Sequence, residues 1–509
     1  MKITVDAQPI TLAEWRAIWQ GPVELTLGQT ALQRIGESQA QIDKVIAGGK
    51  QVYGVNTGFG QLAQVRIGAE KLAALQQNLV LSHSVGVGPP LTNDCVRLAM
   101  VMKVVALAQG FSGVRAELVD ALCKLINGGV YPCIPAKGSV GASGDLAPLA
   151  HMAGLLLGHG TASVGGKNIP AEKALAKVGL APMQLAPKEG LALLNGTQIS
   201  TSLALAAVFR AENILAASLA AGALAADAIK GSDTPFDERI QQVRGHRGQI
   251  DVAAALRKLM EGSDIRASHF DCTRVQDPYS IRCQPQVIGA CLDVMRHVGV
   301  VLAKEANAVT DNPLVFAATD AVLSGGNFHA EPVALAADYL ALSIAEVGAL
   351  SERRIALLID SHLSGLPAFL VREGGLNSGF MMAQVTAAAL ASENKSLAHP
   401  ASVDSIPTSA NQEDHVSMAT FAANRLHTML DNTAYIVAIE MLAAAQGIEF
   451  HHPQKSSKPL EKVIDELRQV SASYTADRSL SEDFEKVAKL IHDGRFLSCA
   501  DRILPSLAG

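Results

Sequence analysis

The stretch TQISTSLALAAVFRAENILAASLAAGALAADAIK, residues 197–230, decides the fold class of this 509-residue chain. It is dominated by alanine and leucine, which are strong helix formers. Its central part, Ile214–Ala226, has 13 uncharged residues between charged flanks, well short of the roughly 20 residues that a membrane-spanning helix needs. We therefore expect one very long helix that is buried in protein.

Helical periodicity recurs along most of the chain. We expect further helices over 12–20, 28–47, 70–82, 92–109, 114–127, 145–157, 280–308, 331–360, 377–397 and 412–446, and a two-helix surface element after residue 455. Helices of about 25–35 residues exceed the globular average and suit a bundle that continues across subunits. The sequence thus predicts a mainly α, long-helix fold, with an N-terminal domain over 1–196 and a central bundle with a helical tail over 197–509.

Composition restricts the class of protein. Of the residues, 49% are hydrophobic but only 4% are aromatic, so small aliphatic side chains must build the core and allow close helix packing. A net charge of -6 without a run of Lys or Arg disfavours nucleic acid or an anionic membrane as the main partner. The seven cysteines are scattered without a C-x-x-C pair, which fits a reducing compartment. With no signal-peptide run at the N-terminus, we expect a cytoplasmic protein, and the missing metal-ligand spacings predict no metal site.

A second stretch, GSVGASGDLAPLAH at residues 138–151, runs from small residues directly into an apolar helical pattern. One interpretation is a flexible loop that leads into a helix N-cap at Asp145. The other is chemical. Attack of the Gly144 nitrogen on the Ala142 carbonyl carbon would close a five-membered ring, and loss of water, including the Ser143 hydroxyl, would leave an exocyclic methylene. Glycine suits this attack because it reaches strained backbone angles at little cost, but these residues alone do not decide between the two interpretations.

Other unusual segments are spread along the chain: YGVNTGFG at 53–60, LLNGTQ at 193–198, QDPY at 276–279, GGNFHAE at 325–331 and NQEDHVSM at 411–418. Several of their residues also have a purely structural interpretation. Tyr53 can pack on the core with its hydroxyl satisfied, and Phe328 can be ordinary core. His83, at an expected helix end, can be a histidine favoured by the helix dipole.

Taken together with GASGDLAP at 141–148 and with Arg282, these segments resemble the histidine branch of the aromatic amino acid ammonia-lyase family, in the family's order. The resemblance implies a fumarase/aspartase-like helical bundle, assembled as a homotetramer with a shared central helical core, whose active sites each draw residues from three subunits. It also implies that Ala142, Ser143 and Gly144 form the family's autocatalytic 4-methylidene-imidazol-5-one, with no external cofactor. The implied reaction is the non-oxidative deamination of L-histidine to trans-urocanate and ammonia, the first step of histidine degradation.

The reaction needs more than acid–base catalysis, which contributes roughly 10²–10⁴-fold, because the β-proton is scarcely acidic and the amine is a poor leaving group. A covalent electrophile makes up the difference. Tyr53 is expected to be the base by its family position, which requires a site that favours the phenolate. Arg282 offers a bidentate contact to the substrate carboxylate, and Asn195 can hold that carboxylate or the prosthetic carbonyl. Tyr279 is expected to shuttle protons or to contact the prosthetic group. The remaining expected substrate-binding residues are His83, Gln276, Phe328, Gln412 and Glu413.

Glu413 and His83 are expected to set the substrate choice. Glu413 can accept a hydrogen bond from an imidazole N–H, and His83 can complete the pairing. A phenyl ring would leave Glu413 buried and unpaired, and relatives that act on tyrosine or phenylalanine typically lack Glu here. The alternatives are a tyrosine or phenylalanine ammonia-lyase or 2,3-aminomutase, a fumarase/argininosuccinase-like lyase, whose signature is absent from the sequence, and a non-catalytic helical assembly protein.

Three expected helix starts, at Asp145, Thr197 and Glu331, lie beside these motifs. We expect their N-termini to converge on Ser143, where their positive field would stabilise a phenolate and activate the electrophile. Cys272 lies in an irregular segment, and its reactivity is left open.

Overall fold

The computed structural model describes residues 1–49, 51–58, 60, 64–269, 275–500 and 502–507, so Cys272 lies outside the described residues. The chain is mainly helical and forms two compact units. The first unit contains Met1–Ala206, Val300–Asp338 and Pro400–Asn424, and the second contains Ala207–Gly299, Tyr339–His399 and Arg425–Gly509. These units interleave in sequence, and the single domain boundary near residue 197 stays a prediction.

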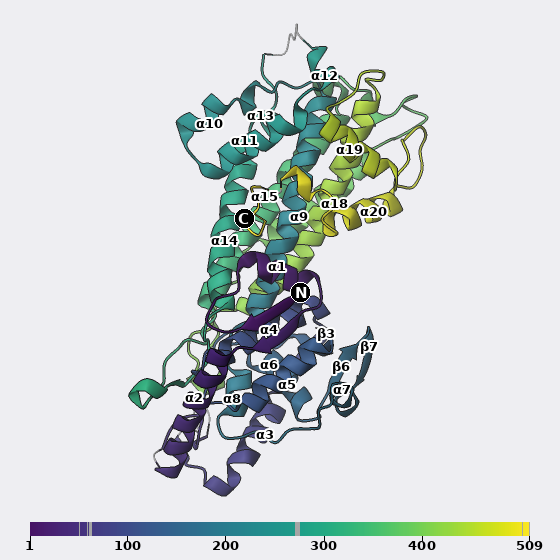
Figure 1. Ribbon diagram of the computed structural model, residues 1–509. Coiled ribbons are helices and arrows are strands. Elements are labelled where there is room, and N and C mark those ends of the chain that lie inside the picture. Colours follow the sequence, from purple (N-terminus) through teal and green to yellow (C-terminus); the bar gives the residue numbers. More distant parts are fainter. Residues whose placement is uncertain (50, 59, 61–63, 270–274, 501, 508–509) are drawn as a thin grey trace. The chain divides into compact units, whose positions relative to one another are not determined.

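The first unit combines helices with short strands (Figure 1). Its helices are α1 (Leu12–Gln20), α2 (Gln29–Ala47), α3 (Leu72–His83), α4 (Asn93–Ala108), α5 (Ala116–Asn127), α6 (Leu146–Leu156), α7 (Ala171–Lys177) and α8 (Glu189–Leu194). Its strands are β1 (Lys2–Val5), β2 (Glu24–Leu27), β3 (Val87–Pro90), β4 (Val130–Pro132), β5 (Pro135–Lys137), β6 (Thr161–Val164), β7 (Lys167–Pro170), β8 (Leu314–Phe316) and β9 (Ala321–Leu323). β1 and β2 pair in parallel with Lys2 opposite Glu24, whereas the pairs β3–β5 and β8–β9 and the sheet β4-β6-β7 are antiparallel.

Helix α4 lies in the core of the first unit. Every residue from Cys95 to Ala108 is buried, as expected for a helix that is apolar on all sides. Two cations, Arg97 and Lys103, are nevertheless buried in this helix. A buried charge is costly without polar partners, so the contacts of Lys103 bear on the site described below.

The second unit is built on the larger parts of four long helices, α9 (Gln198–Ala228), α14 (Gln284–Ala306), α15 (Glu331–Ile359) and α18 (Ala419–Glu449). One end of each helix, residues 198–206, 300–306, 331–338 and 419–424, belongs to the first unit. Its shorter helices are α10 (Glu238–Arg244), α11 (Arg247–Met260), α12 (Asp264–Ala267), α13 (Tyr279–Arg282), α16 (Ser361–Ser364), α17 (Met381–Leu397), α19 (Lys458–Arg468) and α20 (Ser481–His492). Buried polar contacts join the long helices within this unit. Gln284 Nε2 on α14 donates to the Gly222 carbonyl on α9 at 3.2 Å, and Ser343 Oγ on α15 donates to the Cys291 carbonyl on α14 at 3.2 Å.

Most of the predicted helices are observed, with ends within about one turn of the predicted ones. The helix predicted for 412–446 is wrong at its start, because α18 begins at Ala419. The backbones of Thr408 and Glu413 pair instead, with the Thr408 N–H donating to the Glu413 carbonyl at 2.9 Å. Met418 has a left-handed backbone with φ of 57°, so the chain cannot continue as a helix into α18.

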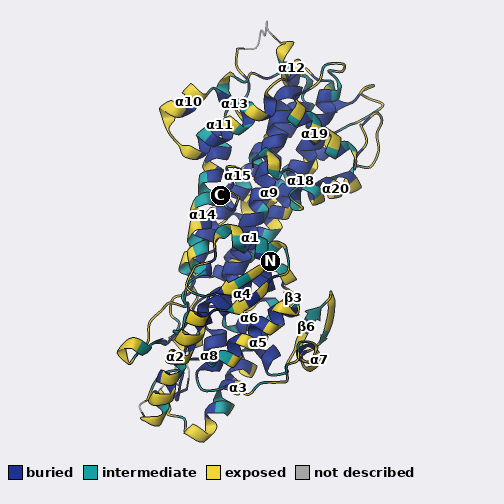
Figure 2. Ribbon diagram, viewed as in Figure 1, coloured by how far each residue is buried: buried dark blue, intermediate teal, exposed yellow. Residues whose placement is uncertain are grey.

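Among the described residues, three helices, α9, α14 and α15, are long and apolar enough to span a membrane by length and composition alone. In α9, 94% of the most apolar window is buried within the protein, compared with 67% in α15 and 44% in α14. Figure 2 shows this burial as dark blue along α9. The prediction that Ile214–Ala226 is a buried helix is therefore confirmed.

A buried ion pair joins α15 to α18 in the second unit. Arg354 and Glu440 are both fully buried, with Nε to Oε1 at 2.5 Å and Nη2 to Oε2 at 2.8 Å, and Ser351 Oγ donates to the same carboxylate. Removing one partner of such a pair leaves an uncompensated buried charge.

We therefore expect Glu440→Gln to lower the free energy of unfolding by about 3–5 kcal/mol, measured by urea unfolding. The control is Glu466→Gln, whose partner Arg495 lies on the surface with a side chain that is 53% exposed, and it should change stability little because solvent screens that pair. Equal losses in the two variants would contradict this account.

Candidate active site

The loop from Gly138 to Asp145 is a tight turn that only glycine can form at two positions. Gly141 and Gly144 have left-handed backbones, with φ of 66° and 75°. A Cβ on Gly144 would lie 2.3 Å from the carbonyl oxygen of Gly196. The next amide, of Asp145, donates to that same carbonyl at 2.7 Å. The loop therefore lies directly against the residues that precede α9.

The Asp145 carboxylate holds this loop in place. It is fully buried, and it accepts hydrogen bonds from Ser139 Oγ (2.9 Å), Thr420 Oγ1 (2.7 Å), and the backbone N–H and hydroxyl of Ser200 (2.8 and 2.9 Å). Asp145 is the N-cap residue of α6, as predicted, but its side chain makes no capping bond to that helix. It caps the first turn of α9 instead.

The starts of α15 and α18 also contact the loop. The Ala330 N–H donates to the Gly141 carbonyl at 3.1 Å, and the Met418 N–H donates to the Val140 carbonyl at 2.8 Å. Ser417 Oγ donates to Gly141 as well, at 3.0 Å. The helix starts at Asp145, Thr197 and Glu331 thus lie at this loop, together with the start of α18. That their positive field acts on Ser143 stays a prediction.

Ser143 contacts a carboxylate in the lining of a cavity of about 280 Å³. Its Oγ donates to Glu413 Oε1 at 2.5 Å, and Thr408 Oγ1 donates to Glu413 Oε2 at 2.6 Å. The cavity is lined by Ser82, His83, Val85, Gly138, Ser139, Val140, Ala142, Ser143, Gly144, Leu146, Ala147, Thr408 and Glu413. Burial would raise the pKa of Glu413, but hydrogen bonds from Ser143, Thr408 and Ser409, together with nearby His83, lower it below its usual value. Glu413 is thus a carboxylate that accepts hydrogen bonds at neutral pH.

His83 is the last residue of α3 and lines the same cavity. Its Nδ1 lies 2.9 Å from the Leu79 carbonyl, which only an Nδ1–H can satisfy. Burial lowers the pKa of His83, although the bond to Leu79 and the charge of Glu413 oppose the shift. A neutral His83 with this tautomer presents Nε2 as a hydrogen-bond acceptor.

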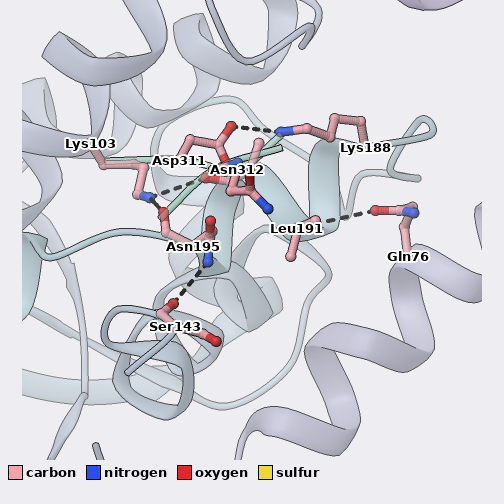
Figure 3. A network of polar contacts seen from close by, with 10 residues as sticks. Gln76, Lys103, Ser143, Lys188, Leu191, Asn195, Asp311 and Asn312 are labelled. Carbon is pink, nitrogen blue, oxygen red and sulfur yellow. Dashed lines mark hydrogen bonds and ion pairs between the residues drawn. The ribbon is translucent and has the colours of Figure 1, made fainter. Parts of the chain in front are cut away.

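Asn195 reaches the loop from the end of α8. Its Nδ2 donates to the Ser143 carbonyl at 2.8 Å, and Figure 3 shows this contact. Its Oδ1 is buried and has no hydrogen-bond partner among the residues that the structure describes. Of the two roles predicted for Asn195, the contact to the carbonyl of residue 143 is the one present in this unit.

Known proteins share this sequence and fold. Residues 10–469 match the family described as aromatic amino acid lyase. The chain belongs to this family. It is 61% identical to a histidine ammonia-lyase of Paracidovorax citrulli over 476 residues, covering 94% of this chain and 93% of that protein.

Solved structures agree with the mainly α, long-helix fold predicted for this aromatic amino acid lyase. A histidine ammonia-lyase from Trypanosoma cruzi superposes with a TM-score of 0.91 at 42% identity, covering 99% of this chain and 96% of that one. A tyrosine aminomutase from Streptomyces globisporus superposes with a TM-score of 0.93 at 34% identity, covering 99% of each chain. The fold prediction is confirmed.

Tyr53 lies half-buried in the loop over residues 51–58, and its environment differs from the expected one. Burial raises its pKa, the backbone bond with Gly60 lowers it, and the charge of Glu413 raises it further. The expectation that the surroundings favour the phenolate is therefore wrong for this unit as it stands. The physical reason is that an apolar, negatively charged surrounding disfavours a second anion.

The other predicted residues lie away from the cavity lining. Phe328 is half-buried and Gln412 is exposed, on the segments that lead into α15 and α18, and neither lines the cavity. Gln276, Tyr279 and Arg282 belong to the second unit. There the Tyr279 side chain is exposed, and the Arg282 guanidinium stacks over its ring, 4.5 Å from the centroid. The roles of all five residues stay predictions.

One close group of metal-ligand side chains occurs among the described residues. One ligand atom each of His329, Glu331 and His415 lies within 4.8 Å of the others. The two rings stack 5.7 Å apart, and His329 Nε2 lies 3.2 Å from the His415 carbonyl. These contacts already join the segments that precede α15 and α18, and the absence of a metal site stays a prediction.

Thr408 and Lys103 support the site but are not among the residues that the sequence motifs predict. Thr408 has no local signature, because its role depends on pairing with Glu413. Lys103 had a usable signal, since it is a lone cation in the middle of an apolar helix, where a charge needs a specific partner.

We expect an NMR titration of ¹³Cε1-labelled protein to give His83 a pKa below its ordinary value of 6.5, and Glu413→Gln to lower it further, because Glu413 raises it. Below pH 6.5 the unfolded chain then binds more protons than the folded one. The stability that neutral His83 contributes is present above that pH and is lost as the pH falls through the folded pKa. An unchanged or raised pKa in Glu413→Gln would contradict the proximity of the two side chains.

Proposed function

We propose that the chain is a histidine ammonia-lyase, which eliminates ammonia from L-histidine to give trans-urocanate and so opens histidine breakdown. The observation that carries the proposal is the pair of acceptors, Glu413 and His83, at the cavity that holds Ser143. Relatives named histidine ammonia-lyase are 61% and 56% identical over nearly the whole chain, and this relationship supports the same substrate.

The two acceptors suit a ring that carries N–H donors. The Glu413 carboxylate and the His83 Nε2 can each accept from such a ring, whereas a phenyl ring would leave both without a partner. In the uncyclised chain the Ser143 hydroxyl occupies Glu413 Oε1. Loss of that hydroxyl on ring formation would free this oxygen for the substrate.

The prosthetic group is proposed to be 4-methylidene-imidazol-5-one, formed from Ala142, Ser143 and Gly144. The Gly144 nitrogen bonds to the Ala142 carbonyl carbon, whose oxygen leaves as water, and Ser143 loses its hydroxyl with its α-hydrogen as a second water. The left-handed Gly144, with no room for a Cβ beside Gly196, supports a turn that brings these atoms together. When formed, the group supplies an electrophilic methylene conjugated to the residue 143 carbonyl.

The chain's own residues would bind substrate and move its protons. We assign Tyr53 to the β-proton, and Arg282 to the substrate carboxylate, with Tyr279, Gln276, Phe328 and Gln412 completing the assembled site. A raised pKa makes the Tyr53 phenolate a stronger but rarer base at neutral pH. The assembled site must therefore add positive charge near Tyr53, and Arg282 is the candidate.

We propose a homotetramer, with each site completed by neighbouring subunits, in the cytoplasm. Apolar side chains at one-turn spacing on α15, namely Leu335, Tyr339 and Leu342, are 57%, 46% and 51% exposed. An exposed stripe of this kind favours burial against another chain. The partly buried apolar window of α14 supports the same assembly.

The alternative within the family is a tyrosine or phenylalanine ammonia-lyase or a 2,3-aminomutase. The likeness of this fold to that of a tyrosine aminomutase is compatible with this alternative. Glu413 argues against it, because an aromatic hydrocarbon ring offers the carboxylate no donor.

Intact mass spectrometry tests the prosthetic group. We expect the purified chain to weigh two waters less than its sequence mass and Ser143→Ala to lose this deficit together with activity, because no hydroxyl is left to eliminate. The exposed control Ser324→Ala should keep both. A wild-type chain at its full sequence mass would overturn the assignment.

Substrate assays test the role of Glu413. We expect Glu413→Gln to lower kcat/KM on histidine by on the order of 10²-fold or more, with a much smaller change in any activity on phenylalanine, because only the imidazole uses the carboxylate. The neighbouring exposed carboxylate provides the control Asp414→Asn, which should affect neither substrate. Equal losses on both substrates would refute the role of Glu413 in specificity.

A further inference from the structure

Lys103 is a buried cation whose partners are backbone carbonyls. Its side chain belongs to α4 and is 1% exposed. Its Nζ donates to the carbonyl oxygens of Ala192 at 3.1 Å and Asn195 at 2.7 Å. Figure 3 shows Lys103 beside Asn195. Among the described residues, Asp311 and Asp145 act on this ammonium through their charges, and its hydrogen bonds go to the two carbonyls. Its hydrogen bonds therefore act on the end of α8.

The beginning of α8 is held by other groups. Lys188, buried and left-handed with φ of 76°, forms an ion pair with Asp311 at 2.6 Å. The Leu191 N–H donates to Gln76 Oε1 at 3.3 Å. Lys103 supplies the corresponding restraint where α8 ends and the chain turns toward the loop at Ser143.

The position of the Asn195 side chain depends on this restraint. Within the described residues the carboxamide makes one hydrogen bond, from Nδ2 to the Ser143 carbonyl, and its Oδ1 has no partner. A single bond does not fix the orientation of the group, so the backbone of the same residue must. The 2.7 Å bond from Lys103 holds that backbone at its own carbonyl.

We propose that Lys103 is a positioning residue for the reaction, which acts by holding Asn195 so that its amide hydrogen-bonds the residue 143 carbonyl. This inference rests on the proposed function. In the proposed electrophile that carbonyl is conjugated to the methylene, and a donor aimed at it withdraws electrons from the reacting carbon. Preorganised donors of this kind contribute strongly in sites that exclude water.

Burial and the neighbouring charges determine the protonation state of Lys103. The pKa of Lys103 is lowered to about 7, mainly by burial and also by the charge of Lys188, while Asp311 and Asp145 oppose the shift. Both the ammonium and the neutral amine carry N–H donors, but the ammonium makes the stronger, charge-assisted bonds to the carbonyls. The restraint on Asn195 is therefore strongest in the protonated form.

A double-mutant cycle in the full-length protein tests the proposal. Lys103→Met keeps a similar length and removes the donors, and Asn195→Ala removes the carboxamide. Both single variants should lower kcat on histidine, by on the order of 10–10²-fold, with little change in KM. If Lys103 acts through Asn195, the double variant should be no slower than Asn195→Ala alone.

Glu440→Gln provides the control for loss of a buried polar contact outside the site, and any effect on kcat should add to that of Asn195→Ala. Additive losses for Lys103 as well, or an unchanged kcat in Lys103→Met, would overturn the proposal. The proposal would also be overturned if the Lys103→Met chain had its full sequence mass while Asn195→Ala kept the two-water deficit. Lys103 would then be needed for forming the prosthetic group, independently of Asn195.

If Lys103→Met does not fold, Lys103→Arg takes its place in the cycle. Arginine keeps two or more N–H donors on a longer side chain, and its effect on kcat should again not add to that of Asn195→Ala. The wild-type mass and urocanate formation are measured first. Failure there refutes the proposed function, whereas additivity in an active wild-type background refutes only the role of Lys103.

Discussion

The buried carboxylate of Asp145 is the interaction on which the candidate active site depends. Its two oxygens accept from the loop itself at Ser139, from the first turn of α9 at Ser200, and from the first turn of α18 at Thr420. Because a buried charge is stable only while such donors surround it, none of these segments can move away independently. The backbone from Gly138 to Asp145 is therefore fixed before any ring forms, and it is better described as an enclosed turn than as a flexible loop.

Periodicity in the sequence identified most helices because their apolar positions follow a 3.6-residue repeat, which is a local property. The start of α18 was wrong for the opposite reason. Residues 412–418 are compatible with a helix locally, but Glu413 pairs with Thr408 and Met418 turns left-handed. The interleaving of 300–338 and 400–424 with the N-terminal segment was also beyond reach, since it depends on contacts between segments far apart in the chain.

The chemical types in the site were more predictable than their contacts. The sequence motifs predict His83, Ser143, Asn195 and Glu413 as site residues, and these four residues lie in one compact unit. The bond from Ser143 to Glu413 and the support from Lys103 depend on tertiary packing, which sequence patterns do not describe. The pKa shift of Tyr53 differs from the expectation for the same reason, because its sign depends on burial and on a neighbouring carboxylate.

The contact between Gly144 and Gly196 has an evolutionary consequence. A Cβ at position 144 meets the backbone of Gly196, and a Cβ at position 196 meets Gln198 and Thr310. Both glycines also have left-handed φ values, so any other residue at either position would be strained as well as crowded. The cavity rim carries no such restriction, because Glu413 is held there by the Thr408 hydroxyl, which other residues can replace. Substrate choice can therefore diverge through substitutions at the cavity rim, whereas the glycines of the loop must be kept.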